Sequence, residues 1–332
     1  MTSTAPSTLP APDAVRTVAC VGAGVIGGGW VAHFLARGYH VVAWDPAPDA
    51  EARLRELVAA AWPALTQLGL ATGASVDNLQ VAATLADAVS RADFVQESAP
   101  ERLDVKVELL AEIDRAAPEH VVVGSSTSGY GMSEMQTGAT LHPERLVVGH
   151  PFNPPYLVPL VEVVGGRASA DWAVRWASEF YRAAGKSVIT LDSELPGFIG
   201  NRIQEAAWRE ALHMVANKEA TVAQIDQAMT DGPGLRWAFH GPCLTFHLAG
   251  GDGGMAHMLD HFGPALRYPW TRLTAPELTD ELRQDMVEGT ERVVNGRTTA
   301  ELIAQRDRRM IAVMRALAEV DRQEVDESTP GR

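Results

Sequence analysis

The chain has 332 residues, of which 46% are apolar and 21% charged, and its formal net charge is −14. This length allows one large or two ordinary domains with a buried core. An acidic chain with three lysines and no basic cluster argues against nucleic acid or an anionic membrane as a partner. No apolar run approaches the ~20 residues that a membrane-spanning helix needs.

The composition of the two ends predicts tails without regular structure. Residues 1–14 are rich in Ala, Pro, Ser and Thr and carry no basic residue, unlike a secretory signal. Residues 321–332 are expected to form a flexible C-terminal tail. The two cysteines, Cys20 and Cys243, give neither a disulfide framework nor a metal-ligand spacing. We therefore expect a cytoplasmic protein.

Strands and helices alternate along residues 15–195. Strands are expected near residues 16–22, 39–45, 79–82, 93–98, 120–126, 146–152, 160–166 and 186–191. Helices are expected near residues 25–37, 48–69, 102–117 and 170–184. This alternation predicts an α/β fold, a Rossmann-type doubly wound and mostly parallel sheet that helices cover on both faces.

The pattern changes after Pro196, where strand signals almost disappear. Helices are expected from about 198 to 218 and near residues 222–230, 238–248, 252–262, 276–293 and 298–318. Thr221 and Gln224 have the spacing of a capping box at the start of one helix. The sequence therefore predicts an α/β domain over 15–195 and an all-helical domain over 196–320, with the boundary near 194–197.

A glycine-rich turn lies between the first expected strand and the first expected helix. Its residues, Gly22-Ala23-Gly24-Val25-Ile26-Gly27, match the G-x-G-x-x-G pattern. In this context the first glycine permits a tight turn, the second lets the backbone approach a pyrophosphate, and the third allows close packing. The N-terminus of the helix offers free N–H groups and a partial positive charge to the phosphates.

Asp45 ends the second expected strand, where a ribose-binding acid belongs. A carboxylate there accepts hydrogen bonds from ribose hydroxyls and repels a 2′-phosphate. The nearest arginine that follows is Arg53, so NAD is the expected cofactor rather than NADP. The alternative is that the glycines form an ordinary turn and Asp45 is a solvated strand end.

His150 and Glu162 are the candidate acid–base pair. A histidine suits proton abstraction from an alcohol, because its unperturbed pKa lies near neutrality. His150 ends an expected strand in GHPFNPPY, and Glu162 lies in the otherwise apolar run LVEVV. A buried carboxylate is costly unless it is paired, and a hairpin would bring it against the imidazole. The alternative is a strand-end histidine and an unrelated buried acid.

Six motifs, in this order, resemble the L-3-hydroxyacyl-CoA dehydrogenase superfamily over about residues 16–320: GAGVIGGGW, ESAPE, SSTS, GHPFNP, LVEVV and PGFIGNR. The resemblance implies an NAD-dependent dehydrogenase in which His150 is the catalytic base and Glu162 its partner. It also implies that Ser128 and Asn201 hydrogen-bond the substrate oxygen. From the residues alone, an ST-turn at Ser128 and a helix-start cap at Asn201 are the simpler interpretations.

The resemblance also places four residues beside the cofactor. Ala99, Glu101 and Lys106 would lie along its nicotinamide and ribose side, and Asn153 near the carboxamide.

The chain departs from the acyl-CoA enzymes of the superfamily after the second expected strand. Those enzymes resemble one another in having a basic helical hairpin there, which holds the CoA phosphates. Here Arg53 and Arg55 are followed by no Lys or Arg before Arg91. A ligand rich in phosphate would lack cationic partners, so we expect a small substrate and not a CoA thioester.

The segments DGPGLRWAF, LAGGDGGM and FGPALRYPWTRL resemble the branch of the superfamily that oxidises the 3-hydroxyl of L-carnitine. A trimethylammonium group cannot donate a hydrogen bond, so aromatic faces and negative potential must recognise it. Arg236 is the candidate partner of the substrate carboxylate. The aromatic candidates are Trp237, Phe239, Phe246, Tyr268 and Trp270. Each ring is equally compatible with packing in a helical core.

Two other functions stay open. The SSTS and HPFNPPY segments also resemble the gulonate dehydrogenase and lambda-crystallin branch, so L-gulonate or 3-hydroxybutyryl-CoA is an alternative substrate. A non-enzymatic, NAD-binding, crystallin-like protein is a third possibility, against which the His150–Glu162 pair argues. His257 and His261 have the i, i+4 spacing of metal ligands, but no further ligand completes a site and no metal is expected. Related folds pair through the helical domain, so a homodimer is expected.

Overall fold

The computed structural model describes residues 5–268, 270–271, 279–299, 301–302, 305, 312–313, 316 and 319–320. Contacts divide the chain into an N-terminal unit, Met1–Arg202, and a C-terminal unit, Ile203–Arg332. The division lies a few residues beyond the predicted boundary at 194–197, because the first turn of helix α7 (Gly200–Ala216) belongs to the N-terminal unit.

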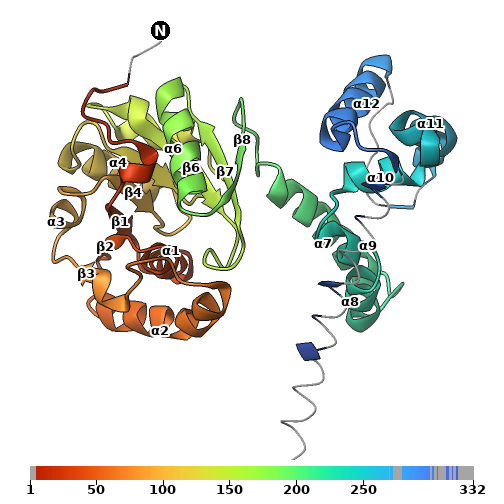
Figure 1. The fold of residues 1–332 in the computed structure, drawn as a ribbon. Coiled ribbons are helices and arrows are strands. Elements are labelled where there is room, and N and C mark those ends of the chain that lie inside the picture. Colours follow the sequence, from red (N-terminus) through yellow and green to blue (C-terminus); the bar gives the residue numbers. More distant parts are fainter. Residues whose placement is uncertain are drawn as a thin grey trace, which may run out of the picture. The chain divides into compact units, whose positions relative to one another are not determined.

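In the described part of the N-terminal unit, eight strands form one sheet in the order β3-β2-β1-β4-β5-β6-β7-β8 (Figure 1). The strands are β1 Thr17–Val21, β2 His40–Trp44, β3 Leu79–Val81, β4 Phe94–Glu97, β5 Val122–Ser125, β6 Leu146–Pro151, β7 Leu160–Gly165 and β8 Ser187–Thr190. All neighbouring pairs are parallel except β6 and β7, which form an antiparallel hairpin. The predicted doubly wound sheet is therefore confirmed.

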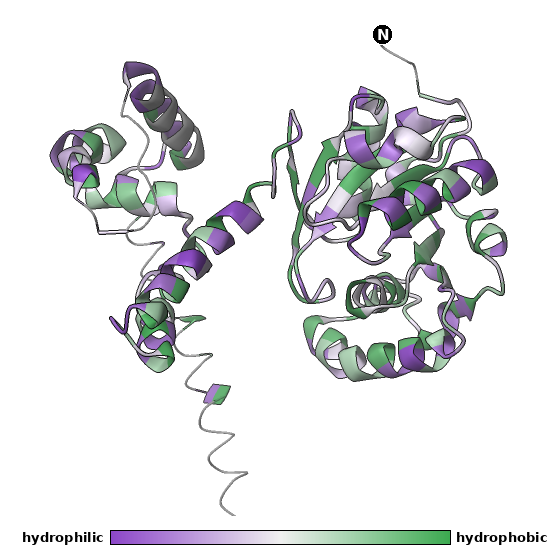
Figure 2. Cartoon of the chain, turned by 180° about the vertical axis from the view of Figure 1, so that it is seen from behind, coloured by the Kyte–Doolittle hydropathy of each residue, from purple (hydrophilic) through white to green (hydrophobic). Residues whose placement is uncertain are grey.

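Helices cover both faces of the sheet. They are α1 Val25–Ala36, α2 Ala50–Leu68, α3 Leu85–Val89, α4 Leu103–Ala116, α5 Met132–Met135 and α6 Asp171–Ala183. On one face, α1 and α6 contribute the aromatic core around Trp30 and Phe180, and α2 packs against α1. On the other face, α3, α4 and α5 pack around Leu110 and Met132. Helix α1 is buried from Gly27 to Ala36, and α2 packs against it. Helix α7, in contrast, has a mixture of hydrophilic and hydrophobic residues along its length (Figure 2).

The strand order positions the site. The chain leaves β1 toward β2 and β3 and then crosses back to β4 on the other side of β1. At such a switch point the turns at the carboxyl ends of adjacent strands diverge and leave room for a ligand. Gly22 follows β1 at this edge, Ser98 follows β4, and Ser126 follows β5. His150 is the last residue but one of β6.

The C-terminal unit is helical in its described part. After α7 come α8 Val222–Thr230, α9 Pro233–Trp237, α10 Pro242–Ala249, α11 Gly254–Phe262 and α12 Asp280–Val294. The predicted capping box of Thr221 and Gln224 is present at the start of α8. Leu244, Val294 and Leu302 form a small core.

Two predictions for this unit need comment. The helix expected at 238–248 is α10, which begins four residues later than expected, because Pro242 occupies its first turn, where a proline begins a helix rather than continuing one. The short helix α9, which begins at Pro233, was not expected. The helix expected at 298–318 lies largely outside the described residues, as does the expected tail at 321–332.

Residues 5–14 differ from the structureless tail that their composition predicts. Leu9 packs against the aromatic core of the N-terminal unit, and the carbonyl oxygen of Pro10 accepts a hydrogen bond from Nε1 of Trp176 at 2.7 Å. A 3-10 turn, Pro12–Ala14, then leads into β1. The packing of Leu9 and the hydrogen bond from Trp176 fix this segment against the N-terminal unit, and the composition of the segment does not predict either contact.

Candidate active site

The three glycines of the G-x-G-x-x-G turn differ in how much space surrounds each of them. Gly22 has a φ of +100°, and a Cβ there would lie 2.5 Å from the carbonyl oxygen of Ser98. A Cβ on Gly27 would overlap the carbonyl oxygen of Gly22. In contrast, nothing lies within 4 Å of a Cβ built on Gly24, the N-cap of α1. The turn thus leaves open space at the helix N-terminus, which fits the pyrophosphate of a dinucleotide.

Asp45 lies beside this turn. One oxygen of its carboxylate accepts the N–H of Ala23 at 2.8 Å, and the other accepts the N–H of Ala47 at 2.9 Å. These bonds fix the carboxylate against the glycine-rich loop, and each oxygen retains a lone pair for a ribose hydroxyl. The residues present therefore fit NAD.

His150 and Glu162 are directly opposite one another in the β6–β7 hairpin. Nδ1 of His150 lies 2.9 Å from Oε2 of Glu162, and the two residues are 4% and 0% exposed. Oε1 of Glu162 accepts the N–H groups of Ile199 and Gly200 at 2.9 and 3.0 Å. The predicted contact is present, and the structure adds two backbone donors from the start of α7 that the sequence does not reveal.

The surroundings keep Glu162 ionised. Burial acts to raise its pKa, but the hydrogen bonds from His150, Gly200 and Ile199 outweigh burial and lower the pKa. An ionised carboxylate is purely an acceptor, so the hydrogen bond requires a proton on Nδ1 of His150. Phe152 and Phe198 flank the imidazole, with ring centroids 5.1 and 5.2 Å away.

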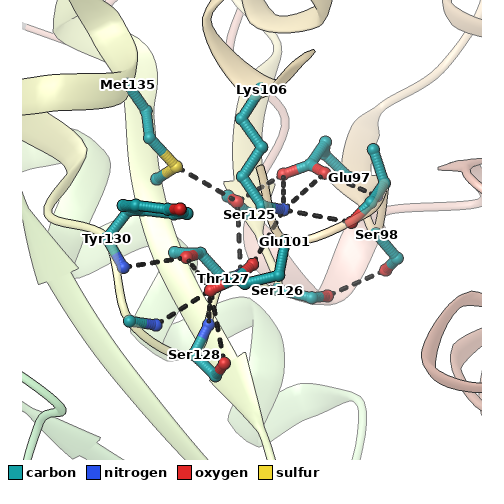
Figure 3. A network of polar contacts seen from close by, with 12 residues as sticks. Glu97, Ser98, Glu101, Lys106, Ser125, Ser126, Thr127, Ser128, Tyr130 and Met135 are labelled. Carbon is teal, nitrogen blue, oxygen red and sulfur yellow. Dashed lines mark hydrogen bonds and ion pairs between the residues drawn. The ribbon is translucent and has the colours of Figure 1, made fainter. Parts of the chain in front are cut away.

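Ser128 and Glu101 meet at the loop after β5 (Figure 3). Oε1 of Glu101 accepts the N–H groups of Ser128 and Gly129, both at 2.9 Å, and the hydroxyl of Thr127 at 2.8 Å. Burial acts to raise the pKa of Glu101, but these hydrogen bonds and the charge of Lys106 lower it overall. The SSTS loop is thus built around an ionised carboxylate, which holds Ser128 in place.

Glu97 is a fully buried acid that sequence reasoning missed. Its carboxylate lies 3.0 Å from Nζ of Lys106, accepts the hydroxyl of Ser125, and accepts the N–H of Ala99 at 2.6 Å. Nζ of Lys106 also donates to the carbonyl oxygen of Ala99 and lies 3.4 Å from Oε2 of Glu101. Lys106 therefore joins the two acids, as Figure 3 shows.

The two candidate asparagines have different surroundings. Asn201 donates from Nδ2 to the carbonyl oxygen of Ser128 at 2.9 Å, which links the start of α7 to the SSTS loop. Asn153 is exposed in the loop between β6 and β7, and a cis peptide bond joins it to Pro154.

The candidate substrate-binding residues lie in the C-terminal unit and fall into three groups. Arg236 and Phe246 line one pocket of about 230 Å³, together with His240, Thr245, Leu248 and Ala249. Tyr268 and Trp270 are exposed and stack on one another, with centroids 6.0 Å apart. Trp237 is exposed and Phe239 is partly buried against His240, and neither lines this pocket.

Two further features bear on the kind of site. The rings of His257 and His261 stack with centroids 5.7 Å apart, and among the described residues no group of three His, Cys, Asp or Glu side chains forms a possible metal site. Within the same residues, no helix combines the length and apolarity needed to cross a membrane.

Family comparisons cover almost the whole chain. The profile described as 3-hydroxyacyl-CoA dehydrogenase, NAD binding domain, matches residues 17–194. The profile described as 3-hydroxyacyl-CoA dehydrogenase, C-terminal domain, matches residues 197–291.

Comparisons with individual proteins also find dehydrogenases. The chain is 78% identical to an L-carnitine dehydrogenase of Nocardiopsis dassonvillei, over 95% of this chain and 96% of that protein. It is 68% identical to an L-carnitine dehydrogenase of Streptomyces coelicolor, over 93% and 96% of the two chains. Among solved structures, an NAD+-dependent 5-formyl-3-hydroxy-2-methylpyridine 4-carboxylic acid 5-dehydrogenase is similar at 28% identity and a TM-score of 0.70, over 92% of this chain and 99% of that one.

Proposed function

The chain belongs to the 3-hydroxyacyl-CoA dehydrogenase family and is an NAD-dependent dehydrogenase, and we propose that it oxidises the 3-hydroxyl of L-carnitine to 3-dehydrocarnitine. The names of relatives at 78% and 68% identity support L-carnitine as the substrate. The single observation that carries the chemistry is the His150–Glu162 dyad, with its 2.9 Å contact.

In this proposal His150 is the general base. Nε2 of its neutral ring accepts the proton of the substrate hydroxyl, and the ring becomes an imidazolium. The Glu162 carboxylate, 2.9 Å from Nδ1, then stabilises that positive charge and holds the ring in the tautomer that the reaction needs. Ser128, on the loop that Glu101 organises, and Asn201, at the start of α7, would orient the substrate oxygen.

NAD+, when bound, accepts the hydride that leaves the carbinol carbon. Gly22, Gly24 and Gly27, with the intervening Val25 and Ile26, would hold its pyrophosphate at the N-terminus of α1. Asp45 would hold the adenosine ribose, and Ala99, Glu101, Lys106 and Asn153 would lie along the nicotinamide half.

The surface of α2 favours a small substrate. Arg53 is paired with Asp49 at 3.4 Å, and Arg55 with Glu51 at 2.8 Å. The two arginines of this helix are therefore neutralised by acids one turn away, and neither is left to hold a chain of CoA phosphates. This arrangement argues against 3-hydroxybutyryl-CoA.

The pocket in the C-terminal unit offers both chemistries that L-carnitine requires. Arg236 supplies a cation for the carboxylate, and Phe246 an aromatic face for the trimethylammonium group. Trp237, Phe239, Tyr268 and Trp270 remain additional candidates for the cationic group. We also propose that the protein is a homodimer in the cytoplasm.

The test is NADH formation, followed by absorbance, with L-carnitine, D-carnitine, L-gulonate and 3-hydroxybutyryl-CoA side by side. Turnover of L-carnitine well above the other three supports the substrate, and absence of turnover with L-carnitine refutes it. His150→Ala should lose most turnover and still bind NAD. His142→Ala is the matched control, because it removes another His–Glu pair, 3.3 Å from Glu144, at the opposite end of β6.

A further inference from the structure

Lys186 is a buried cation just before β8, and the function proposed above gives it no task. The residue is 7% exposed. Its Nζ donates to the carbonyl oxygens of Pro155 and of Val158, the latter at 3.2 Å. In the described part of the chain these acceptors are backbone carbonyls and not carboxylates. Burying an ammonium group without an acidic partner costs free energy, so the presence of a lysine at this position needs an explanation.

Both carbonyls belong to one short loop, residues 152–159, which joins β6 to β7. The two strands on either side carry His150 and Glu162. The loop begins with Phe152, whose ring lies against His150. Nζ of Lys186 therefore binds the loop that connects the strand of His150 to the strand of Glu162.

The same ammonium also reaches helix α1. It lies 5.0 Å from the centroid of the Trp30 ring, which is a cation–π contact. Next to Trp30, Gly29 leaves room for the loop, since a Cβ there would lie 2.6 Å from Cδ of Pro155. The loop thus contacts both α1, which follows the glycine-rich turn, and Lys186, which precedes β8.

The surroundings of Lys186 disfavour its charged form, so placing a lysine there has an energetic cost. Burial, and to a smaller extent the charge of Arg37, lowers the pKa of Lys186 to about 7. His33, also on α1, is buried, and its pKa falls well below the usual range through burial and the charge of Lys186. A methionine would fill this site without either penalty, yet could not bind the two carbonyls.

We propose that Lys186 is a positioning residue whose Nζ fixes the 152–159 loop, so that the imidazole of His150 and the side chain of Asn153 keep the places that hydride transfer requires. This inference rests on the proposed function, because it assumes that His150 is the base. A displacement of about 1 Å in such a group costs about 10²-fold in rate.

The test compares Lys186→Met with Lys218→Met, an exposed lysine of the C-terminal unit. We expect kcat with L-carnitine to fall about 10²-fold in Lys186→Met, with less change in KM, and to stay at the wild-type value in Lys218→Met. A folded Lys186→Met enzyme with kcat within about threefold of wild type would overturn the proposal.

A second variant separates positioning from loss of folding. Lys186→Ala leaves a space for n-propylammonium, which should restore kcat, whereas n-propanol should not. Equal recovery of the melting temperature and of kcat with n-propanol would show that Lys186 is merely structural. His150→Ala is assayed in parallel: wild-type kcat in that variant refutes the proposed base, whereas wild-type kcat in the Lys186 variants alone refutes the positioning role.

Discussion

Glu162→Gln tests the dyad without changing its shape. The amide would have to place its oxygen toward the N–H groups of Ile199 and Gly200, because the reverse orientation leaves two buried donors facing an NH₂ group. Each unsatisfied donor costs about 1–3 kcal/mol, so the orientation is fixed. The NH₂ group then faces Nδ1 of His150 and donates to it.

A hydrogen bond donated to Nδ1 forces the proton of the imidazole onto Nε2, which can then no longer accept one from the substrate. The wrong tautomer and the lost carboxylate charge should lower kcat by about 10³- to 10⁴-fold, equivalent to about 4–5 kcal/mol of transition-state stabilisation. The assay is steady-state NADH formation at saturating L-carnitine and NAD+, with NAD affinity measured separately.

The control is Glu194→Gln, since Glu194 also accepts a backbone N–H, that of Ser133, but contacts neither member of the dyad. Its kcat should equal that of wild type. A Glu162→Gln enzyme that is folded, binds NAD normally and retains kcat within tenfold of wild type would refute the tautomer argument.

Three further predictions follow from other features. Gly27→Ala should prevent a stable fold, because its Cβ would overlap the carbonyl oxygen of Gly22, whereas Gly24→Ala should keep the wild-type melting temperature and weaken NAD binding about tenfold by titration. Asp45→Asn should lower the preference for NAD over NADP, measured as the ratio of kcat/KM values, about tenfold; an unchanged ratio would contradict its ribose role. The pKa of Lys186 is about 7 in the fold and 10.5 ordinarily, so between these values the unfolded chain binds more protons and the free energy of unfolding rises with pH. Urea titrations at intervals across this range should show that rise, of at most about 1.4 kcal/mol per pH unit, and Lys186→Met should abolish it.

Features whose signal lies within one short stretch of sequence could be predicted. The glycine-rich turn, Asp45 and the alternation of strands and helices are of this kind, and the structure places them as expected. The contact of His150 with Glu162 was predictable because an acid in an apolar strand needs a partner, and the hairpin brings a histidine opposite to it.

Features that depend on partners from other elements, or on backbone groups, could not be predicted. Glu97 looks like the end of an ordinary buried strand, and its partners Lys106 and Ser125 come from a helix and from another strand. The carbonyls that hold Lys186 are present in every peptide unit, so no residue type marks them. The same holds for the Ile199 N–H that binds Glu162, since its position depends on where α7 begins.

The β6–β7 hairpin also has a consequence for how the site assembles. His150 and Glu162 are 12 positions apart, whereas Asn201 and the Ser128 carbonyl that it binds are 73 apart. Closing the longer loop costs roughly 1.6 kcal/mol more chain entropy. The His150–Glu162 contact is therefore the more local of the two, whereas the Asn201–Ser128 contact, like the bonds from Ile199 and Gly200 to Glu162, requires the start of α7 to be in place. Displacing the start of α7 would therefore remove two backbone donors from Glu162 and the Asn201 contact together.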